Sequence, residues 1–305
     1  MLFLITVFTP TYNRAYILPN LYKSLVAQSD KHFEWVVVDD GSSDNTESLI
    51  NEWILEGKVR IHYKKQLNQG KHIAINTGVQ MAKGELFFIV DSDDDLTPDA
   101  IGKVRDFWIS KQPDSKISGI ISYRQFHDGR LVGTSLPSDV TRCKLRDVGR
   151  LGSSGDKVVI YRTEIMKRFP YPKFEGERFF GESYVFNQID DDFDMLVMDE
   201  RVYNFDYQPD GLSQDFRKLY RENPKGFHFS LSESLRREVQ LKNRISISVN
   251  VCCLSIRIGK YGNYLFSKYF INRLLLTPVG LYQYYKIFIK QASDVKPFID
   301  SEDNN

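Results

Sequence analysis

Short apolar runs alternate with helix-like stretches along the first 125 residues, and this rhythm limits the fold more than any other feature of the sequence. Strands are predicted over LFLITVF, FEWVVVD, VRIHY, LFFIVD and KISGIISY, with helices over the stretches between them. Such an alternation predicts a mostly parallel sheet with helices on both faces, joined by right-handed crossovers. The predicted fold class is therefore α/β, and 305 residues suffice for one large domain of this class plus appendages.

Three polar motifs follow the predicted strands. They are TPTYNR after the first strand, DDGSSDNT after the second and DSDDD after the fourth. In parallel sheets, ligands bind beyond the carboxyl ends of the strands, so this shared position predicts one common site.

The third motif places four carboxylates directly after a buried strand, at Asp91, Asp93, Asp94 and Asp95. Unit like charges ~4 Å apart repel by roughly 4 kcal/mol at an effective dielectric near 20, so such a cluster requires a cation, a shared proton or water. Asp91 and Asp93 leave one face of an extended segment and could form half of a Mg²⁺ or Mn²⁺ site. Asp94, Asp95 and Asp99 fit an acidic surface turn instead.

Further candidates come from the first motif and from a predicted helix entrance. Tyr12 could offer a flat ring to a nucleotide base, with Arg14 nearby for charge, although an ordinary strand-to-helix turn explains the same residues. A helix entrance with basic neighbours is a reasonable seat for a diphosphate, and its candidate residues are Gly70, Lys71, His72 and Asn76.

Two other kinds of site fit poorly. A phosphatase loop requires two aspartates that are two positions apart, whereas Asp39 and Asp40 are adjacent. A Rossmann dinucleotide site requires G-x-G-x-x-G after the first strand, and that motif does not occur there.

The charge is unevenly distributed along the chain. Residues 215–291 hold fourteen Lys/Arg against four Asp/Glu, residues 1–214 carry a net charge of −6, and the tail from 292 carries −3. We predict a domain over 1–214, a basic helical region over 215–291 and a disordered acidic tail over 292–305. The basic region suits an anionic surface, or it is simply a solvated helical face. Pro278 is expected to open one of its helices.

The cysteines and the N-terminus bear on the compartment. Three cysteines without a CxxC pair, and only five histidines, argue against a disulfide framework or a structural zinc site. The first residues lack a basic leader and a small-residue cleavage site. No predicted helix reaches ~18 uninterrupted apolar residues. A cytoplasmic protein is expected, with a helix in the membrane interface as an open alternative.

Taken together, the motifs resemble those of the family 2 glycosyltransferases of the GT-A fold, over about residues 1–215. The resemblance implies that a nucleotide base, usually uracil, is held by Pro10, Thr11, Tyr12 and Asp40. It also implies that Lys71, His72 and Asn76 line the base and diphosphate region. Asp91, Ser92 and Asp93 match the D-x-D element, in which the last aspartate contacts the metal and the first commonly reaches the ribose.

The resemblance also points to a general base. Glu182 in FFGESYVF falls where inverting relatives carry this carboxylate, although many of them have Glu-Asp where this chain has Glu182-Ser183. Glu175 and Glu177 remain rivals, and Glu182 could instead interact with a helix dipole. Asp210 in DGLS is a candidate for a further metal contact.

The implied function is metal-dependent transfer of a sugar, with inversion, from a nucleotide-diphospho-sugar to an acceptor hydroxyl. The expected donor is a UDP-sugar, the cofactor Mn²⁺ or Mg²⁺, and the acceptor a glycan or lipid-linked glycan of a surface polysaccharide. Peripheral association with the inner face of the membrane is compatible with the basic region, and no nucleic-acid partner is expected. Two alternatives are a non-catalytic nucleotide-sugar sensor or assembly subunit, and a sugar nucleotidyltransferase, which normally carries a Gly-rich basic loop after its first strand.

Overall fold

The computed structural model describes residues 5–206, 215–266 and 270–290, which fall into two compact units. Unit 1 comprises Met1–Pro172 and Glu182–Pro209, and unit 2 comprises Lys173–Gly181 and Asp210–Asn305. The domain boundary predicted at residues 214 and 215 stays a prediction. The short segment 173–181 belongs to unit 2 although it precedes that boundary.

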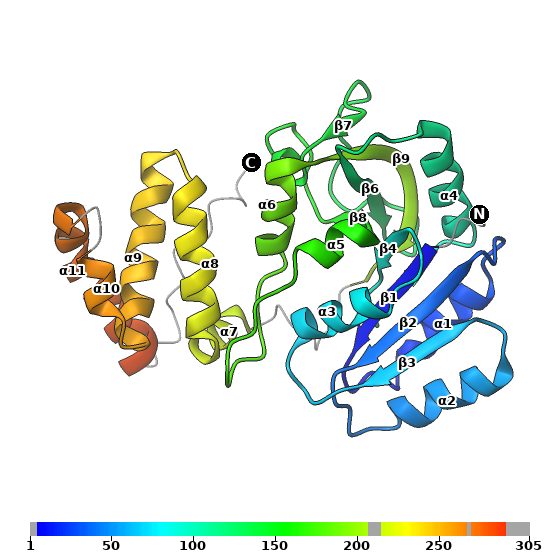
Figure 1. The fold of residues 1–305 in the computed structure, drawn as a ribbon, viewed down its shortest axis with the longest axis horizontal. Coiled ribbons are helices and arrows are strands. Elements are labelled where there is room, and N and C mark those ends of the chain that lie inside the picture. Colours follow the sequence, from blue (N-terminus) through cyan, green and yellow to red (C-terminus); the bar gives the residue numbers. More distant parts are fainter. Residues whose placement is uncertain (1–4, 207–214, 267–269, 291–305) are drawn as a thin grey trace. The chain divides into compact units, whose positions relative to one another are not determined.

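Unit 1 is built on a nine-stranded sheet (Figure 1). Its strand order is β3 (Ile61–Lys65), β2 (Phe33–Asp39), β1 (Ile5–Thr11), β4 (Leu86–Ile89), β8 (Lys157–Arg162), β6 (Ile117–Gln125), β9 (Asp194–Asn204) and β5 (Asp95–Leu96), and β7 (Arg142–Cys143) pairs with β9. The α/β class is confirmed.

The strand directions are more mixed than predicted. The first four strands in this order run parallel, and so do β6 and β9. Strand β8 is antiparallel to both β4 and β6, and β9 is antiparallel to β5 and β7. Buried strands of either direction appear as continuous apolar runs, so the sequence pattern cannot distinguish them. The strand-like stretches DMLVMD and RVYN are parts of the single strand β9.

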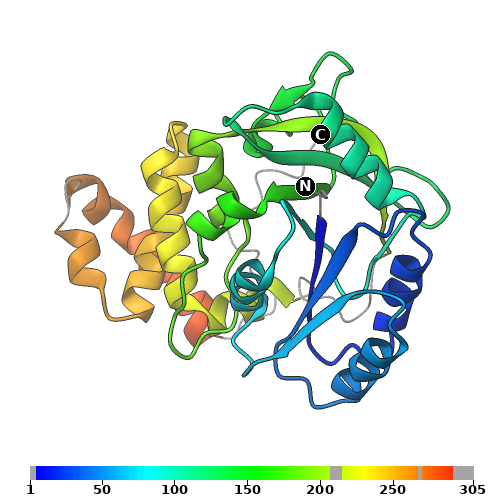
Figure 2. The same cartoon turned by 45° about the vertical axis from the view of Figure 1, so that its right-hand side comes forward.

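Helices cover both faces of the sheet (Figure 2). They are α1 (Leu18–Val26), α2 (Thr46–Glu56), α3 (Lys71–Met81), α4 (Ala100–Lys111), α5 (Thr163–Arg168) and α6 (Ser183–Asp192). On one face, Trp35 of β2 stacks on Trp53 of α2 with ring centroids 5.9 Å apart. On the other face, Phe8 of β1 lies so close to Gly78 of α3 that a Cβ there would be 2.0 Å from the ring.

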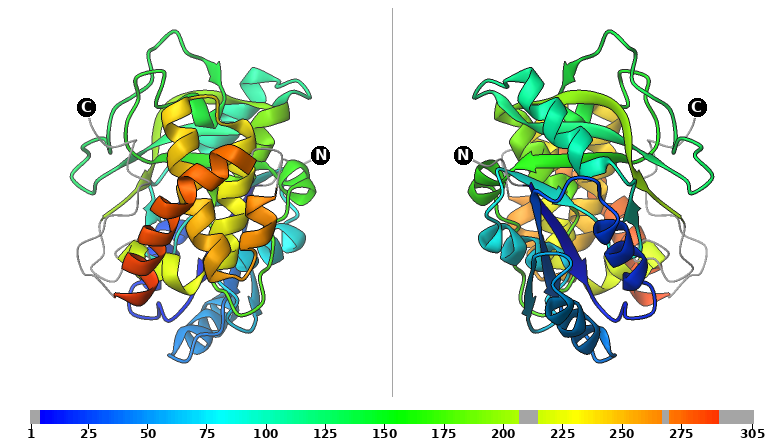
Figure 3. Two further views of the ribbon diagram at one scale, coloured as in Figure 1. Left: turned by 90° about the vertical axis from the view of Figure 1, so that its left-hand side faces the viewer. Right: turned by 90° about the vertical axis from the view of Figure 1, so that its right-hand side faces the viewer.

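Unit 2 is helical and contains α7 (Phe216–Glu222), α8 (Pro224–Arg237), α9 (Leu241–Arg257), α10 (Tyr261–Leu265), α11 (Phe270–Tyr284) and a π-helical turn, η3 (Tyr285–Ile289). Helix α9 packs against both α8 and α11 (Figure 3). The predicted C-terminal helical extension is confirmed, but Pro278 lies inside α11 and does not open it. No helix of the described ranges is both long and apolar enough to cross a bilayer.

Candidate active site

The three polar motifs meet at one edge of the sheet because β1, β2 and β4 run parallel. Thr11, the last residue of β1, pairs with Asp39, the last residue of β2. Asp91 follows two residues after the end of β4, and the Val90 N–H donates to the carbonyl of Phe8 in β1. The Thr11 hydroxyl oxygen is buried at this edge and has no hydrogen-bond partner among the described residues.

Asp40 holds the loop that leads into α3. Its Oδ1 accepts hydrogen bonds from the Gln66 side chain at 2.8 Å and from the Gln69 N–H at 2.9 Å. Its Oδ2 accepts from the Gly70 N–H at 2.7 Å. Gly70 has a φ of 94°, which other residues rarely adopt, and it starts α3 in this position. Asp40 therefore fixes the entrance of α3 beside the end of β2.

The first motif is joined to the second through Asn13. Its N–H donates to the Ser42 hydroxyl oxygen at 2.8 Å, and its side-chain oxygen accepts from the Ser43 N–H at 2.8 Å. Asn13 adopts a positive φ of 53°, as asparagine tolerates. Pro10 is buried at the end of β1, whereas the neighbouring Tyr12 is 48% exposed. Tyr12 thus presents an accessible ring at the sheet edge.

Lys71, the first residue of α3, joins two of the predicted site residues. Its Nζ lies 2.7 Å from Oδ1 of Asp91 and 2.7 Å from Oε1 of Glu182. Burial alone would lower the pKa of Lys71, but the two carboxylates raise it above its usual value. The ammonium group therefore stays charged, and it brings the end of β4 and the start of α6 together.

Burial has the largest influence on the pKa values of the aspartates after β4. Burial and then the charge of Asp91 raise the pKa of Asp93, whose Oδ2 lies 3.9 Å from the Arg14 guanidinium. Burial and then Asp91 raise the pKa of Asp94 to about 8. Burial would also raise the pKa of Asp91, but Lys71 and Arg124 lower it. Ser92 is buried between the two predicted ligands.

The predicted acidic surface turn is wrong for Asp94 and Asp95. Asp94 is 5% exposed and accepts a hydrogen bond from the Tyr203 hydroxyl at 2.7 Å. Asp95 is partly buried and accepts from the Asn204 amide at 2.7 Å. The pairing of β5 with β9 covers both residues, so only Asp99 of the three is exposed.

Two residues of this cluster escaped the sequence analysis, namely Arg124 of β6 and Tyr203 of β9. The Arg124 guanidinium lies 3.8 Å from Asp94 and stacks over the Tyr203 ring at 4.6 Å from its centroid. The Tyr203 hydroxyl oxygen also accepts from the Asp91 N–H at 3.0 Å. No motif marks either residue, because both come from strands whose local pattern is that of ordinary buried strands.

His72 and Asn76 line the inner side of α3. His72 is 3% exposed, and burial lowers its pKa to about 4, so the ring is neutral near pH 7. Asn76 donates to the Tyr171 carbonyl and accepts from the Tyr171 N–H, both at 2.8 Å. The Tyr171 hydroxyl in turn donates to the backbone carbonyl of Glu182 at 3.3 Å. Direct contact of either residue with a nucleotide stays a prediction.

The three candidate bases differ in what their carboxylates do. Glu182 stands at the N-cap position of α6 without a side-chain capping bond, and its carboxylate contacts Lys71. Glu177 caps α8, since its two oxygens accept from the Lys225 and Gly226 N–H groups at 2.7 and 2.8 Å. The Glu175 backbone carbonyl accepts from the Lys225 ammonium group at 2.9 Å. Asp210 lies outside the described residues.

Asp91 and Asp93 fit a divalent cation that arrives together with a diphosphate. Among the described residues, no group of three or more His, Cys, Asp or Glu side chains is arranged to hold a metal ion by itself. Mg²⁺ and Mn²⁺ commonly take one or two carboxylates and complete their coordination with phosphates and water. Burial and the charge of Asp91 raise the pKa of Asp93, and a bound cation would stabilise its charged form.

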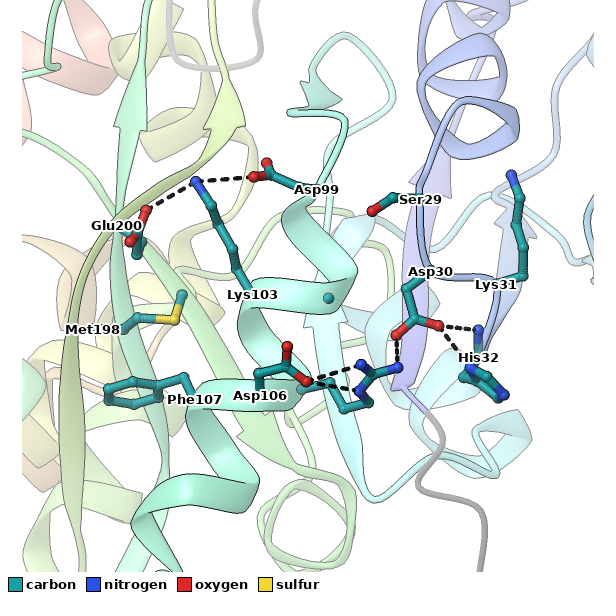
Figure 4. A pocket seen from close by; sticks show the side chains of 12 residues that line it. Ser29, Asp30, Lys31, His32, Asp99, Lys103, Asp106, Phe107, Met198 and Glu200 are labelled. Atoms are coloured by element: carbon teal, nitrogen blue, oxygen red, sulfur yellow. Dashed lines mark hydrogen bonds and ion pairs between the residues drawn. The ribbon is translucent and has the colours of Figure 1, made fainter.

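A second charged region of unit 1 is a hollow between residues 29–32, α4 and β9 (Figure 4). Lys103 bridges Asp99 at 3.2 Å and Glu200 at 2.9 Å. Asp30 pairs with Arg105 and with His32. Part of the hollow is formed by the loop that precedes β2, away from the carboxyl end of that strand, and most of its carboxylates are exposed. We therefore place the candidate active site at the edge that carries Asp91.

Comparison with known proteins identifies the family that this chain resembles. Residues 6–139 match the model of the family described as glycosyl transferase family 2. The GalNAc(5)-diNAcBac-PP-undecaprenol beta-1,3-glucosyltransferase of Campylobacter jejuni is 33% identical over 98 residues, which cover 32% of this chain and 32% of that protein. The chain spans less than half the length of several curated relatives that it matches.

Two solved structures share the fold. TarS of S. aureus in complex with UDP-GlcNAc has a TM-score of 0.60 and 18% identity, over 94% of this chain and 82% of that one. The mannosyltransferase PcManGT of Pyrobaculum calidifontis in complex with GDP-Man and Mn²⁺ has a TM-score of 0.55 and 14% identity, over 94% and 88%. Residues 6–139 thus carry a glycosyl transferase family 2 domain, within a chain whose fold is shared by TarS and PcManGT.

Proposed function

We propose that this protein transfers a sugar, with inversion, from a UDP-sugar to a hydroxyl group of a glycan or lipid-linked glycan in surface polysaccharide synthesis. The observation that carries the proposal is the position of Lys71, whose Nζ lies 2.7 Å from both Asp91 and Glu182. One side of this cluster is the D-x-D element, and the other is the candidate base. A donor diphosphate and an acceptor hydroxyl would have to meet in such a place.

The nucleotide side of the site consists of the first two motifs. Tyr12 would stack on the base, while Thr11 and Asp40 would read its polar edge and Pro10 would shape the pocket floor. The buried Thr11 hydroxyl, which has no partner among the described residues, supports this assignment because buried polar groups normally find one. Gly70, His72 and Asn76 would line the path from the base to the diphosphate.

The diphosphate side requires positive charge. Asp91 and Asp93 would hold a Mn²⁺ or Mg²⁺ ion, with Ser92 between them. This ion, when bound, would act as a Lewis acid that neutralises the leaving nucleoside diphosphate. Lys71 and Arg14 already face Asp91 and Asp93, so both could turn toward the phosphates once the ion takes over these carboxylates.

On the acceptor side, Glu182 would accept the proton of the attacking hydroxyl. The acceptor oxygen forms a bond to C1 of the sugar while the bond from C1 to the diphosphate oxygen breaks, and the diphosphate leaves with that electron pair. Attack from the face opposite the leaving group inverts C1. A single carboxylate suffices for this reaction, which agrees with the presence of Ser183 after Glu182.

Support for the donor and acceptor classes comes from the similar proteins. TarS was solved with UDP-GlcNAc, and the Campylobacter enzyme is named for a glucosyl transfer to an undecaprenol-linked glycan. An undecaprenol carrier would confine the acceptor to a membrane. We therefore place the protein in the cytoplasm, at the inner face of the membrane.

A thermal-shift screen of UDP, GDP, TDP and CDP, each with and without Mn²⁺, tests the donor class directly. We expect the largest stabilisation with UDP and Mn²⁺ together, because a ligand that binds only the folded protein raises its melting temperature. A stronger response to another nucleotide would exclude the UDP assignment. Release of UDP from UDP-sugars then tests catalysis, since binding without release would favour the sensor function.

A further inference from the structure

The inward face of α11 carries polar and small residues beside partly buried apolar ones such as Leu276 and Tyr284. Gln283 donates to the Asn250 side chain at 2.8 Å, and Thr277 and Tyr261 share a hydrogen bond of 3.0 Å. Arg273 donates to the Tyr264 carbonyl at 2.6 Å. A Cβ at Gly280 would lie 2.6 Å from Sγ of Cys252, so α11 approaches α9 closely at this residue. These contacts fix which side of α11 faces the rest of unit 2.

The opposite face is apolar and exposed. We call it the α11 stripe and define it as Leu275, Val279, Tyr282, Tyr285 and Ile289, which are between 50% and 71% exposed. Their separations of four, three, three and four residues align them along one side of α11 and η3. The described residues leave at least half of each of these side chains exposed.

The outward side of α11 differs from that of most helices on water-soluble proteins. Such a helix packs its apolar side inward and leaves its polar side in water. Here two tyrosines and three aliphatic residues face outward. Contiguous exposed apolar surface of this kind marks an interaction site.

The charges beside the stripe indicate its partner. Residues 270–290 contain Arg273, Lys286 and Lys290 but no Asp or Glu. The Lys286 ammonium group lies 4.6 Å from the centroid of the Tyr282 ring, so a cation accompanies the exposed aromatic surface. Apolar and aromatic side chains flanked only by cations match the boundary between anionic lipid headgroups and acyl chains. Two copies of the same cationic stripe would instead repel each other.

We propose that the α11 stripe binds the surface of an anionic lipid bilayer, with its apolar side chains in the interface and Lys286 and Lys290 on the headgroups. Since no described helix can cross a bilayer, this contact would be peripheral. It would deepen the proposed function by holding the protein at the surface where a lipid-linked acceptor resides. It does not depend on sugar transfer, because it rests on unit 2 alone.

Flotation of the full chain with vesicles tests the proposal. We expect the protein to float with vesicles of phosphatidylcholine and phosphatidylglycerol but not with phosphatidylcholine alone, and to dissociate at high salt. The paired variant L275E/V279E should bind at least about tenfold more weakly, because each glutamate removes apolar contact and adds a charge that the lipid repels. The variant K286Q/K290Q should show a weaker dependence on phosphatidylglycerol.

The control is L55E/I109E, which introduces the same charges at exposed apolar positions of α2 and α4 in unit 1. It should float like the original protein, and both paired variants should keep the original melting temperature. Absence of flotation by the original protein, or equal flotation of L275E/V279E, would overturn the proposal. So would a dimer in lipid-free solution that L275E/V279E dissociates, because the stripe would then bind a second copy. UDP release with a soluble acceptor reports separately on the proposed function.

Discussion

Two lysines of unit 1 each bridge a pair of carboxylates, and their surroundings differ. Lys71 contacts Asp91 and Glu182, both at 2.7 Å, and Lys103 contacts Asp99 at 3.2 Å and Glu200 at 2.9 Å. Their side chains are similarly exposed, at 30% and 34%. The local motif is therefore the same in both places.

The difference lies in burial. Beside Lys71, burial is the main cause of the raised pKa values of Asp93 and Asp94. Beside Lys103, the side chains of Asp99, Glu200 and Asp106 are between 48% and 70% exposed. A surface salt bridge is worth little, whereas a buried charge is stable only if a ligand or a proton relieves it. The comparison thus separates a candidate binding site from a solvated charged surface by burial, which the bridging lysine alone does not reveal.

Substitution of Glu182 and of Glu177 gives the sharpest test of which residue is the general base. We expect E182Q to reduce sugar transfer by about 1,000-fold, because general-base catalysis typically contributes 10²–10⁴-fold. UDP binding in Mn²⁺ should be retained. The control E177Q alters the group that caps α8 and should leave turnover within about twofold. Turnover that survives E182Q but fails in E177Q would move the role of base to Glu177.

Removing one carboxylate from each charged region tests whether the buried carboxylates bind a cation. We expect D93A to lower the affinity for UDP in Mn²⁺ by about 100-fold, because a metal ligand is lost, and to leave the weak metal-free affinity unchanged. D106A, an exposed carboxylate of the hollow, should bind UDP like the original protein. Isothermal titration with and without Mn²⁺ measures both, and equal affinities for D93A and the original protein would refute the metal role.

His72 of the candidate site and His32 of the hollow extend the comparison of the two regions to the stability of the fold. In the unfolded chain His72 takes up a proton near pH 6.5, but in the folded protein only near pH 4. At this residue the unfolded state therefore binds more protons in this window, so the stability that His72 contributes is complete above pH 6.5 and is lost as the pH drops toward 4. The loss amounts to roughly 3 kcal/mol at the lower end.

We expect H72Q to flatten this part of the pH profile in urea unfolding. The matched control is H32Q, because His32 is exposed in the hollow between residues 29–32, α4 and β9, and pairs with Asp30. H32Q should keep the slope of the original protein. A slope that persists in H72Q would mean that another group titrates between these pH values.

Substitution of each bridging lysine by glutamine gives the smallest expected effect. K71Q should weaken UDP binding in Mn²⁺ by about tenfold, because the variant loses a charge that could turn to the diphosphate. K103Q should change neither UDP binding nor stability by more than about 0.5 kcal/mol, as for other surface ion pairs. Equal effects of the two substitutions on UDP binding would remove the distinction between the regions.

Much of the site could be predicted from the sequence because its motifs follow strands. Asp40, Asp91 and Asp93 each end or follow a buried apolar run, and parallel strands bring such ends to one edge. Glu182 was found only through the family resemblance, since no local pattern separates it from Glu175 or Glu177. The structure distinguishes them by contacts, because Glu177 caps a helix while Glu182 reaches Lys71.

Other features depend on contacts that no local pattern records. The burial of Asp94 follows from the pairing of β5 with β9, and Arg124 enters the cluster from β6, a strand that carries none of the three polar motifs. The sequence also indicates a basic, aromatic C-terminal region. It does not indicate that α11 turns its apolar side outward, because a helical pattern defines two faces without saying which one is buried.

The sequence by itself determined the alternation of strands and helices, the edge at which polar motifs gather and the family to which they are similar. Each of these depends on residues close together in the chain. Tertiary structure decided the directions of the later strands, the partner of each carboxylate and the outward face of α11. Those depend on which distant segments come into contact, and it is these contacts that set the dielectric surroundings and the charge balance of each group.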